Sequence, residues 1–197
     1  MIALSQAAAT DEFGGRVVGV VSDRADAAGL ERARSANIAT AVVALEDFES
    51  RSQWDDAIAK AVGAFNPDLV VLAGFMRILG EPMLEKFGGR IVNTHPALLP
   101  AFPGAHAVRD ALEAGVKVTG CSVIIIDAGV DTGPIVAQAA VVVRDNDTEA
   151  TLHERIKDVE RDLVVHTVGR MIREGWRVES RTVHLGDSAA IESDPLH

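Results

Sequence analysis

The sequence is poor in residues that crosslink small proteins and in runs that could enter a membrane. Cys121 is the single cysteine, which excludes an internal disulfide, and no spacing of cysteine and histidine resembles a zinc site. No window approaches the roughly 20 apolar residues of a membrane span, and the start lacks the basic and apolar stretches of a signal peptide. We therefore expect a soluble, cytoplasmic protein that needs no structural metal.

Positive charge is also scarce. The chain has 19 lysines and arginines against 29 acidic residues, a formal net charge of −10. Affinity for a phosphate backbone comes from clustered basic side chains, so this balance disfavours nucleic acid as a partner. With 197 residues and 48% hydrophobic content, the chain can bury a sizeable core. We expect one domain over residues 1–185, followed by a polar tail over 186–197.

Between residues 16 and 143, short apolar runs alternate with segments of helical period. This alternation predicts an α/β fold with a doubly wound, mostly parallel sheet. The predicted strands cover 16–23, 38–45, 68–75, 90–95, 116–127, 134–143 and 177–183. The predicted helices cover 26–37, 50–65, 105–115 and 146–172, the last with a capping box of Asn146 and Glu149.

A polar pair ends the apolar run at 90–95. Residues i and i+2 of a strand face the same way, so Asn93 and His95 leave the sheet edge side by side, where open α/β sheets bind ligands. An amide can donate to a developing oxyanion and an imidazole can move a proton, which together suit attack of an amine on a carbonyl. The alternative is a histidine that caps the strand and an asparagine that satisfies a turn.

The segment DAGVDTG, residues 127–133, places two aspartates between predicted strands. A carboxylate beside an imidazole stabilises its charged form, so an aspartate here could keep His95 protonated and oriented. A simple turn or a weak calcium loop accounts for the same residues, although their spacing does not match an EF-hand. The spacing alone leaves these alternatives open.

Three motifs, taken in order, resemble one enzyme family. They are AGFMRIL (73–79), NTHPALLPAFPGAH (93–106) and GCSVIIIDAGVDTGPIVAQ (120–138). They resemble the folate-dependent formyltransferases, and the similarity runs from SDRADAAGLERAR at residue 22 to the predicted helix at 146–172. THPALLPAFPG is similar to the branch that acts on glycinamide ribonucleotide. Methionyl-tRNA formyltransferases usually carry a tryptophan-containing loop after LLP, and the hydrolases that release formate tend to show a second histidine where Pro96 stands.

The resemblance implies that the amine of glycinamide ribonucleotide attacks the formyl carbon of 10-formyltetrahydrofolate, a cosubstrate, without a metal. Asn93, His95 and Asp131 match the catalytic trio: the amide and the protonated ring would stabilise the oxyanion, while the carboxylate would hold the ring and order a water. The positions matching the folate site are Arg51, Met76, Arg77, Ile78, Leu79, Asn93, Asp127, Ala128, Gly129, Val130 and Asp131. The positions matching the ribonucleotide site are Lys157, Asp158, Val159 and Glu160.

Simpler interpretations exist for some of these positions. Arg51 could be an ordinary solvated helix residue, and Lys157 and Glu160 could form a surface ion pair one helical turn apart. His106 stands where the family often has histidine, and we expect it to be structural. The expected assembly is a monomer or a homodimer.

The family's first strand and its glycine-rich phosphate loop have no counterpart in this sequence. MIALSQAAATDEFGG resembles the remainder of the helix that follows that loop. That strand is central in a doubly wound sheet, so we expect the strands at 16–21 and 68–73 to lack a shared neighbour. The start could lie downstream of the true one, the chain could be an inactive folate-binding remnant, or the two strands could close on each other. A hydrolase that transfers the formyl group to water is a further alternative.

Overall fold

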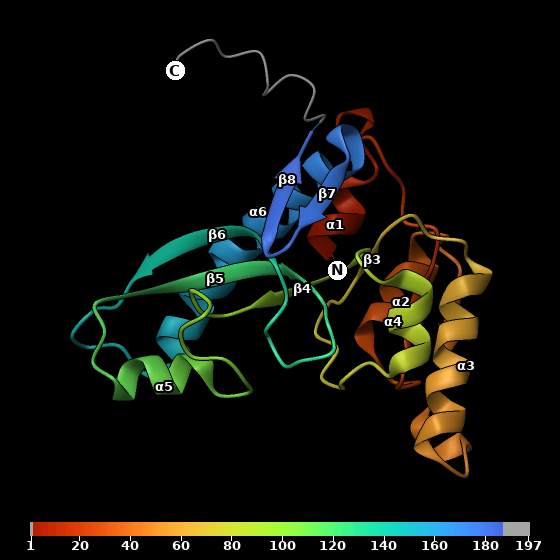
Figure 1. The fold of residues 1–197 in the computed structure, drawn as a ribbon, viewed down its shortest axis with the longest axis horizontal. Coiled ribbons are helices and arrows are strands. Elements are labelled where there is room, and N and C mark those ends of the chain that lie inside the picture. The colour runs from red at the N-terminus through yellow and green to blue at the C-terminus, as the bar shows by residue number, and fades with distance from the viewer. Residues whose placement is uncertain (1, 187–197) are drawn as a thin grey trace.

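The computed structural model describes residues 2–186, in which helices and strands alternate and confirm the α/β class. The strands are β1 (Val20–Ser22), β2 (Thr40–Val42), β3 (Val70–Val71), β4 (Ile91–His95), β5 (Val118–Ile125), β6 (Ile135–Val142), β7 (Trp176–Glu179) and β8 (Thr182–Leu185). The helices are α1 (Ile2–Ala7), α2 (Ala28–Ser35), α3 (Arg51–Ala64), α4 (Glu81–Phe87), α5 (Ala107–Glu113) and α6 (Glu149–Glu174), with short 3-10 turns η1 (Asp11–Phe13) and η2 (Leu45–Asp47) (Figure 1).

The strands form two sheets. β1 and β2 make a parallel pair, and the other strands make a six-stranded sheet of order β3-β4-β5-β6-β8-β7. Within that sheet, β3 and β4 and also β6 and β8 run parallel, whereas β4–β5, β5–β6 and β7–β8 are antiparallel. The sheet is therefore mixed, with more antiparallel pairing than the sequence led us to expect. The short loop between β5 and β6 explains part of this difference, because parallel neighbours need a long crossover.

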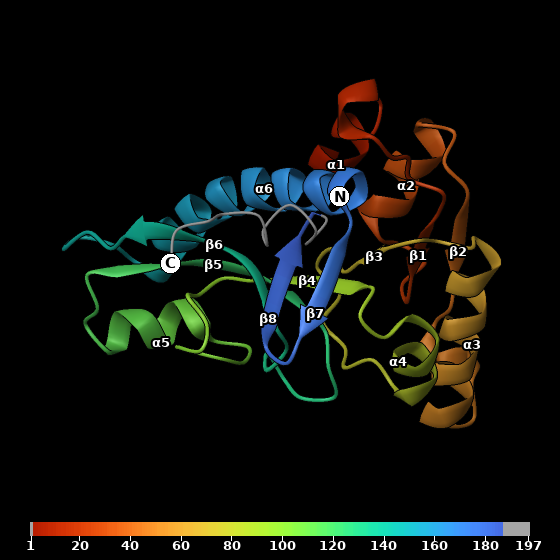
Figure 2. The same cartoon turned by 45° about the horizontal axis from the view of Figure 1, so that its top comes forward.

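Helices cover both faces of this sheet (Figure 2). Consecutive side chains of β4 point to opposite faces and contact different helices. Val92 packs with Met171 of α6, the longest of the described helices. Ile91 points the other way and packs with Trp54 of α3 and Met83 of α4. Alternation along the strand thus assigns α6 to one face and the α3–α4 pair to the other.

β1 and β3 are shorter and more exposed than predicted. The apolar runs at 16–23 and 68–75 are typical of buried strands, but β1 has three residues, β3 has two, and all of them are half-buried. Each strand is paired on one side only, β1 with β2 and β3 with β4. The run at 68–75 is apolar on both faces, which is typical of a central strand, but within residues 2–186 β3 is an edge of the six-stranded sheet. The prediction that these two strands lack a shared neighbour is confirmed within residues 2–186, and they do not close on each other.

Three local predictions also need correction. The cap of α6 is Thr148, whose hydroxyl accepts from the Thr151 N–H, rather than Asn146 with Glu149. The predicted strand at 177–183 is a hairpin of β7 and β8 that turns at Ser180, where φ is 56°. Helix α4 was not predicted, although its first turn contains a proline, a common helix start.

Within residues 2–186, no helix is both long and apolar enough to cross a membrane. β8 ends at Leu185, where we placed the end of the domain. Residues 187–197, almost all of the predicted polar tail, lie outside the described residues, so the domain boundary stays a prediction.

Candidate functional site

The end of β4 presents Asn93 and His95 on one face of the sheet and Thr94 on the other. His95 is 4% exposed and stands opposite Ser122 of β5 in the antiparallel register. Asn93 is half-buried, and its side-chain amide has no hydrogen-bond partner among residues 2–186. This face of β4 therefore holds one buried imidazole and one amide that is free to bind a ligand.

Both ring nitrogens of His95 face oxygen acceptors. Nδ1 lies 3.3 Å from Oδ2 of Asp131, and Nε2 lies 2.8 Å from the carbonyl oxygen of Phe102. The two contacts come from loops on either side of the ring, so together they fix the orientation of the imidazole. The same Asp131 oxygen accepts from the Gly104 N–H at 2.8 Å, so loop 96–104 and the aspartate hold each other in place.

The loop between β5 and β6 uses its two aspartates differently. Asp131 is in the left-handed region, with φ of 54°, and its carboxylate reaches His95. Asp127 closes a turn instead: its Oδ1 accepts from the Gly129 N–H at 3.0 Å and from the Thr132 hydroxyl at 2.7 Å. The turn interpretation therefore holds for Asp127 and not for Asp131. Within residues 2–186, no group of three or more acidic, histidine or cysteine side chains could hold a metal ion.

The structure brings Arg51 to the segment 76–79. The Arg51 guanidinium donates to the carbonyl of Ile78 and to Asp55 of its own helix, and it lies 4.8 Å from the centroid of the Trp54 ring. Arg51 is therefore more than a solvated helix residue. On the same segment, Nε of Arg77 donates to Asp23 at 2.5 Å, which ties the segment to the end of β1.

The side chains of this segment differ in what they can contact. Met76 is 83% exposed and Ile78 is 65% exposed, so both are open to a ligand. Leu79 is 7% exposed and packs in the core around Trp54, so only its backbone is available for binding. Large apolar side chains exposed together are typical of a binding surface.

Of the four candidate residues on α6, Glu160 alone is shown in contact with β4. The Thr94 hydroxyl donates to Glu160 at 2.5 Å, on the face of the sheet opposite His95. Lys157 pairs with Glu154 at 2.7 Å, so the surface ion pair considered for Lys157 and Glu160 is not the one formed. The other two residues also have local partners: Asp158 bonds to Arg161, and Val159 packs beside Leu152 and Ile156.

Burial also changes the chemistry of Cys121 on this α6 face. The side chain is fully buried, which raises the pKa of the Cys121 thiol from an ordinary value of 9.0 to about 11, and the nearby Glu160 carboxylate adds to the shift. The thiol is therefore protonated and unreactive at neutral pH.

A family model described as formyl transferase matches residues 2–168. The match covers well over half of the chain. This chain belongs to the formyl transferase family.

Relatives agree with that assignment. The phosphoribosylglycinamide formyltransferase of Mycobacterium tuberculosis is 52% identical over 184 residues, which cover 93% of this chain and 85% of that protein. The crystal structure of glycinamide ribonucleotide transformylase 1 from Symbiobacterium toebii matches with a TM-score of 0.90 and 44% identity, covering 94% of this chain and 87% of that one. A formyltetrahydrofolate deformylase from Pseudomonas syringae has a TM-score of 0.86 at 23% identity, covers 94% of this chain and 61% of that one, and shows the shared fold alone.

Ser122 and Gln138 hold loop 96–104 of this formyl transferase chain in place, and neither was predicted from the sequence. The Ser122 hydroxyl accepts from the Leu99 N–H at 3.0 Å and donates to the Ala97 carbonyl at 2.7 Å. Gln138 donates to the Leu99 carbonyl and to Ser122, both at 2.9 Å. Each is a polar residue inside an otherwise apolar strand, which could have marked it as a candidate. Only the strand register shows that Ser122 stands beside His95.

Proposed function

We propose that this chain transfers the formyl group of 10-formyltetrahydrofolate to the amine of glycinamide ribonucleotide, a step of purine biosynthesis in the cytoplasm. The observation that carries the proposal is the buried contact between His95 and Asp131 at the end of β4. It joins the two motifs whose resemblance suggested this reaction, in a chain 52% identical to a phosphoribosylglycinamide formyltransferase. Both substrates are small molecules, and the reaction as proposed involves no nucleic acid or membrane.

Asn93 is the proposed direct donor to the oxyanion. Attack of the amine on the formyl carbon turns the carbonyl oxygen into an oxyanion, and a donor placed beforehand stabilises it most. The Asn93 amide is the group on this face of β4 without a partner among residues 2–186. Donation by Asn93 would therefore break no hydrogen bond to another of these residues.

His95 contributes a positive charge in the proposed mechanism, and Asp131 keeps that charge in position. Both ring nitrogens already face oxygen atoms: Nδ1 lies beside Asp131, and Nε2 lies beside the Phe102 carbonyl. Direct donation to the substrate would require Nε2 to leave Phe102, since the aspartate holds the other nitrogen. Over one turnover, the attacking amine gives up a proton and N10 of the folate gains one, and a water beside Asp131 is the proposed carrier.

The exposed segment 76–79 and Arg51 form the proposed folate site, and loop 127–131 closes it from the β5 side. The support is the Arg51 bond to the Ile78 carbonyl and the exposed Met76 side chain. For the ribonucleotide, Glu160 is the strongest of the α6 candidates because it reaches β4. Lys157 and Asp158 would have to leave the local ion pairs that they form here.

The test is to mix the chain with 10-formyltetrahydrofolate and follow release of tetrahydrofolate with and without glycinamide ribonucleotide. Release that depends on the ribonucleotide, with formylated ribonucleotide as the product, is the expected result. Equal release in its absence would identify water as the acceptor, and binding without release would identify an inactive folate-binding protein. Either result would overturn the proposal.

A further inference from the structure

A hydrogen bond joins β4 to α6 at the end of the strand where the proposed catalytic groups lie. The Thr94 hydroxyl donates to Oε1 of Glu160 at 2.5 Å, and both residues are half-buried. Thr94 stands between Asn93 and His95, but strand alternation directs it to the opposite face of the sheet. Because a strand rises about 3.3 Å per residue, Glu160 is held at the same level of β4 as Asn93 and His95.

The Glu160 carboxylate has no cation beside it in the described part of the chain. Lys157 and Arg161, its basic neighbours on α6, pair with other acidic residues at 2.7 Å and 2.6 Å. Among residues 2–186, no basic side chain lies within ion-pair distance of Glu160. Its charge acts on the surroundings, since it adds to the raised pKa of the Cys121 thiol. A partly buried carboxylate of this kind needs hydrogen-bond donors in place of a cation.

The bond to Thr94 uses only part of the acceptor capacity of Glu160. An ionised carboxylate can accept about four hydrogen bonds through its two oxygens, and Oε2 accepts none from residues 2–186. A ligand with hydroxyl donors can therefore bind Oε2 without displacing Thr94. The ribose ring of glycinamide ribonucleotide has two neighbouring hydroxyl groups of this kind.

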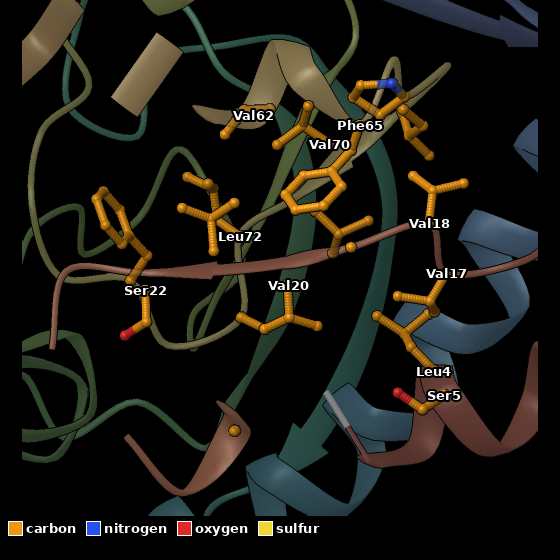
Figure 3. A pocket seen from close by; sticks show the side chains of 18 of the residues that line it. Leu4, Ser5, Val17, Val18, Val20, Ser22, Val62, Phe65, Val70 and Leu72 are labelled. Carbon is orange, nitrogen blue, oxygen red and sulfur yellow. The ribbon is translucent and has the colours of Figure 1, made fainter. Parts of the chain in front are cut away.

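The cavity of about 400 Å³ between β1 and β3 offers a polar ligand fewer partners. Figure 3 shows mostly apolar side chains around it, among them Val20, Val70 and Leu72. Thr94 and Glu160 are not among the residues that line it. The carboxylate that could accept from hydroxyl groups therefore lies outside this cavity, beside the end of β4.

Thr94 restricts the direction in which the Glu160 carboxylate points. A free glutamate side chain samples many rotamers, and ordering it when a ligand binds costs affinity. Threonine is branched at Cβ and is stiff about χ1, so its hydroxyl holds the acceptor in one place. The carboxylate is therefore arranged before the ligand arrives, and the ligand does not have to order it.

We propose that Thr94 is a positioning residue for the acceptor substrate: by holding Oε1 of Glu160, it leaves Oε2 available to the ribose hydroxyl groups of glycinamide ribonucleotide. The inference rests on the proposed function and gives Thr94 a role in the affinity for one substrate only. Asn93 and His95 lie on the other face of β4, so Thr94 takes no part in the chemical step. Loss of its hydroxyl should raise KM for the ribonucleotide and leave kcat nearly unchanged.

The experiment measures binding by calorimetry with two ligands, glycinamide ribonucleotide and its analogue without the 2′ and 3′ hydroxyl groups. Thr94→Val removes the donor and keeps the β-branched shape, whereas Thr94→Ser keeps the donor. The control is Thr167→Val, which alters a fully buried threonine of α6 whose hydroxyl has no hydrogen-bond partner among residues 2–186. Steady-state turnover gives kcat and KM for each protein.

Thr94→Val should weaken binding of the ribonucleotide about three- to tenfold, the cost of ordering one long side chain. The same variant should bind the analogue as the unaltered chain does, because the analogue has no hydroxyl groups for Glu160 to accept from. Thr94→Ser and Thr167→Val should match the unaltered chain with both ligands.

Equal loss of affinity for both ligands would show that Thr94 only supports the packing of β4, and it would overturn the inference. Unchanged binding of the ribonucleotide by Thr94→Val, or a fall in kcat without a change in KM, would overturn it as well. If the unaltered chain did not bind the ribonucleotide at all, the proposed function would be wrong, and this inference with it.

Discussion

Two halves of the molecule differ in how completely their strands are covered: the covered half contains β4, β5, β6 and α6, and the open half contains β1, β2, β3, α3 and α4. In β5, every residue after the first is buried, whereas no residue of β1 or β3 is fully buried. The proposed catalytic groups lie on the covered half, at the end of β4 and in the loop after β5. The segment 76–79 and Asp23 lie at the open half, after β3 and directly after β1, and the Arg77–Asp23 bond joins them. The comparison indicates that the proposed catalytic groups rest on a fully buried core, whereas the proposed folate surface rests on half-buried strands.

A matched pair of valine substitutions would test this difference directly, and it has the largest expected effect on stability. Val123→Ala removes a fully buried side chain of β5 and should lower the free energy of unfolding by about 2 to 3 kcal/mol. Val21→Ala removes the same atoms from half-buried β1 and should cost less than about 1 kcal/mol. Urea denaturation measures both. Equal costs would mean that the two halves are equally well packed.

Trp54→Phe would test whether the core of the open half supports folate binding. Trp54 is fully buried and donates to the Val43 carbonyl at 2.8 Å, so the change leaves that acceptor unpaired and should cost about 1 to 3 kcal/mol. Its ring also lies 4.8 Å from Arg51, so we expect weaker folate binding, measured by calorimetry.

Ile58→Val is the control for the Trp54 substitution. Ile58 lies on the same helix and in the same core but has no aromatic ring to pair with Arg51, and the change should cost about 0.5 to 1.5 kcal/mol. Folate affinity should be unchanged. If Ile58→Val weakened folate binding as much as Trp54→Phe, general loosening of the core would explain both.

The smallest expected effect is a loss of stability at alkaline pH, caused by Cys121 in the covered half. The Cys121 pKa is raised from 9.0 to about 11, so the thiol of the unfolded chain ionises first as pH rises. Stability should be unaffected by this group below pH 9 and should fall between about pH 9 and pH 11. The sequence has no tyrosine to titrate in that range. In denaturant titrations, Cys121→Ala should reduce this alkaline loss, and an unchanged loss would exclude the thiol as its source.

Patterns that extend over many residues predicted elements of both halves. The segment of helical period at 50–65 predicted α3 of the open half, and the apolar runs at 116–127 and 134–143 predicted β5 and β6 of the covered half. The side of β4 on which Asn93 and His95 lie followed from strand alternation alone. Two local predictions, the cap of α6 and the single strand at 177–183, were wrong. They depend on the Thr148 side chain and on the left-handed backbone at Ser180, which the apolar pattern does not reveal.

The partners of the proposed site were less accessible to sequence reasoning. The choice between Asp127 and Asp131 depends on a left-handed backbone at residue 131, which spacing does not reveal. The Phe102 carbonyl and Ser122 become neighbours of His95 only through the loop path and the register of β4 with β5. The exposure of β1 and β3 agrees with the prediction that these two strands share no neighbour within residues 2–186.

The most direct test of the central claim is the single-turnover rate of formyl transfer by His95→Ala, measured together with its affinity for 10-formyltetrahydrofolate. The control is His106→Ala, which alters an exposed histidine at the start of α5. The account predicts that His95→Ala loses about 10² to 10⁴ in rate with affinity nearly intact, while His106→Ala behaves like the unaltered chain. A His95→Ala protein that transferred the formyl group at the unaltered rate would contradict it.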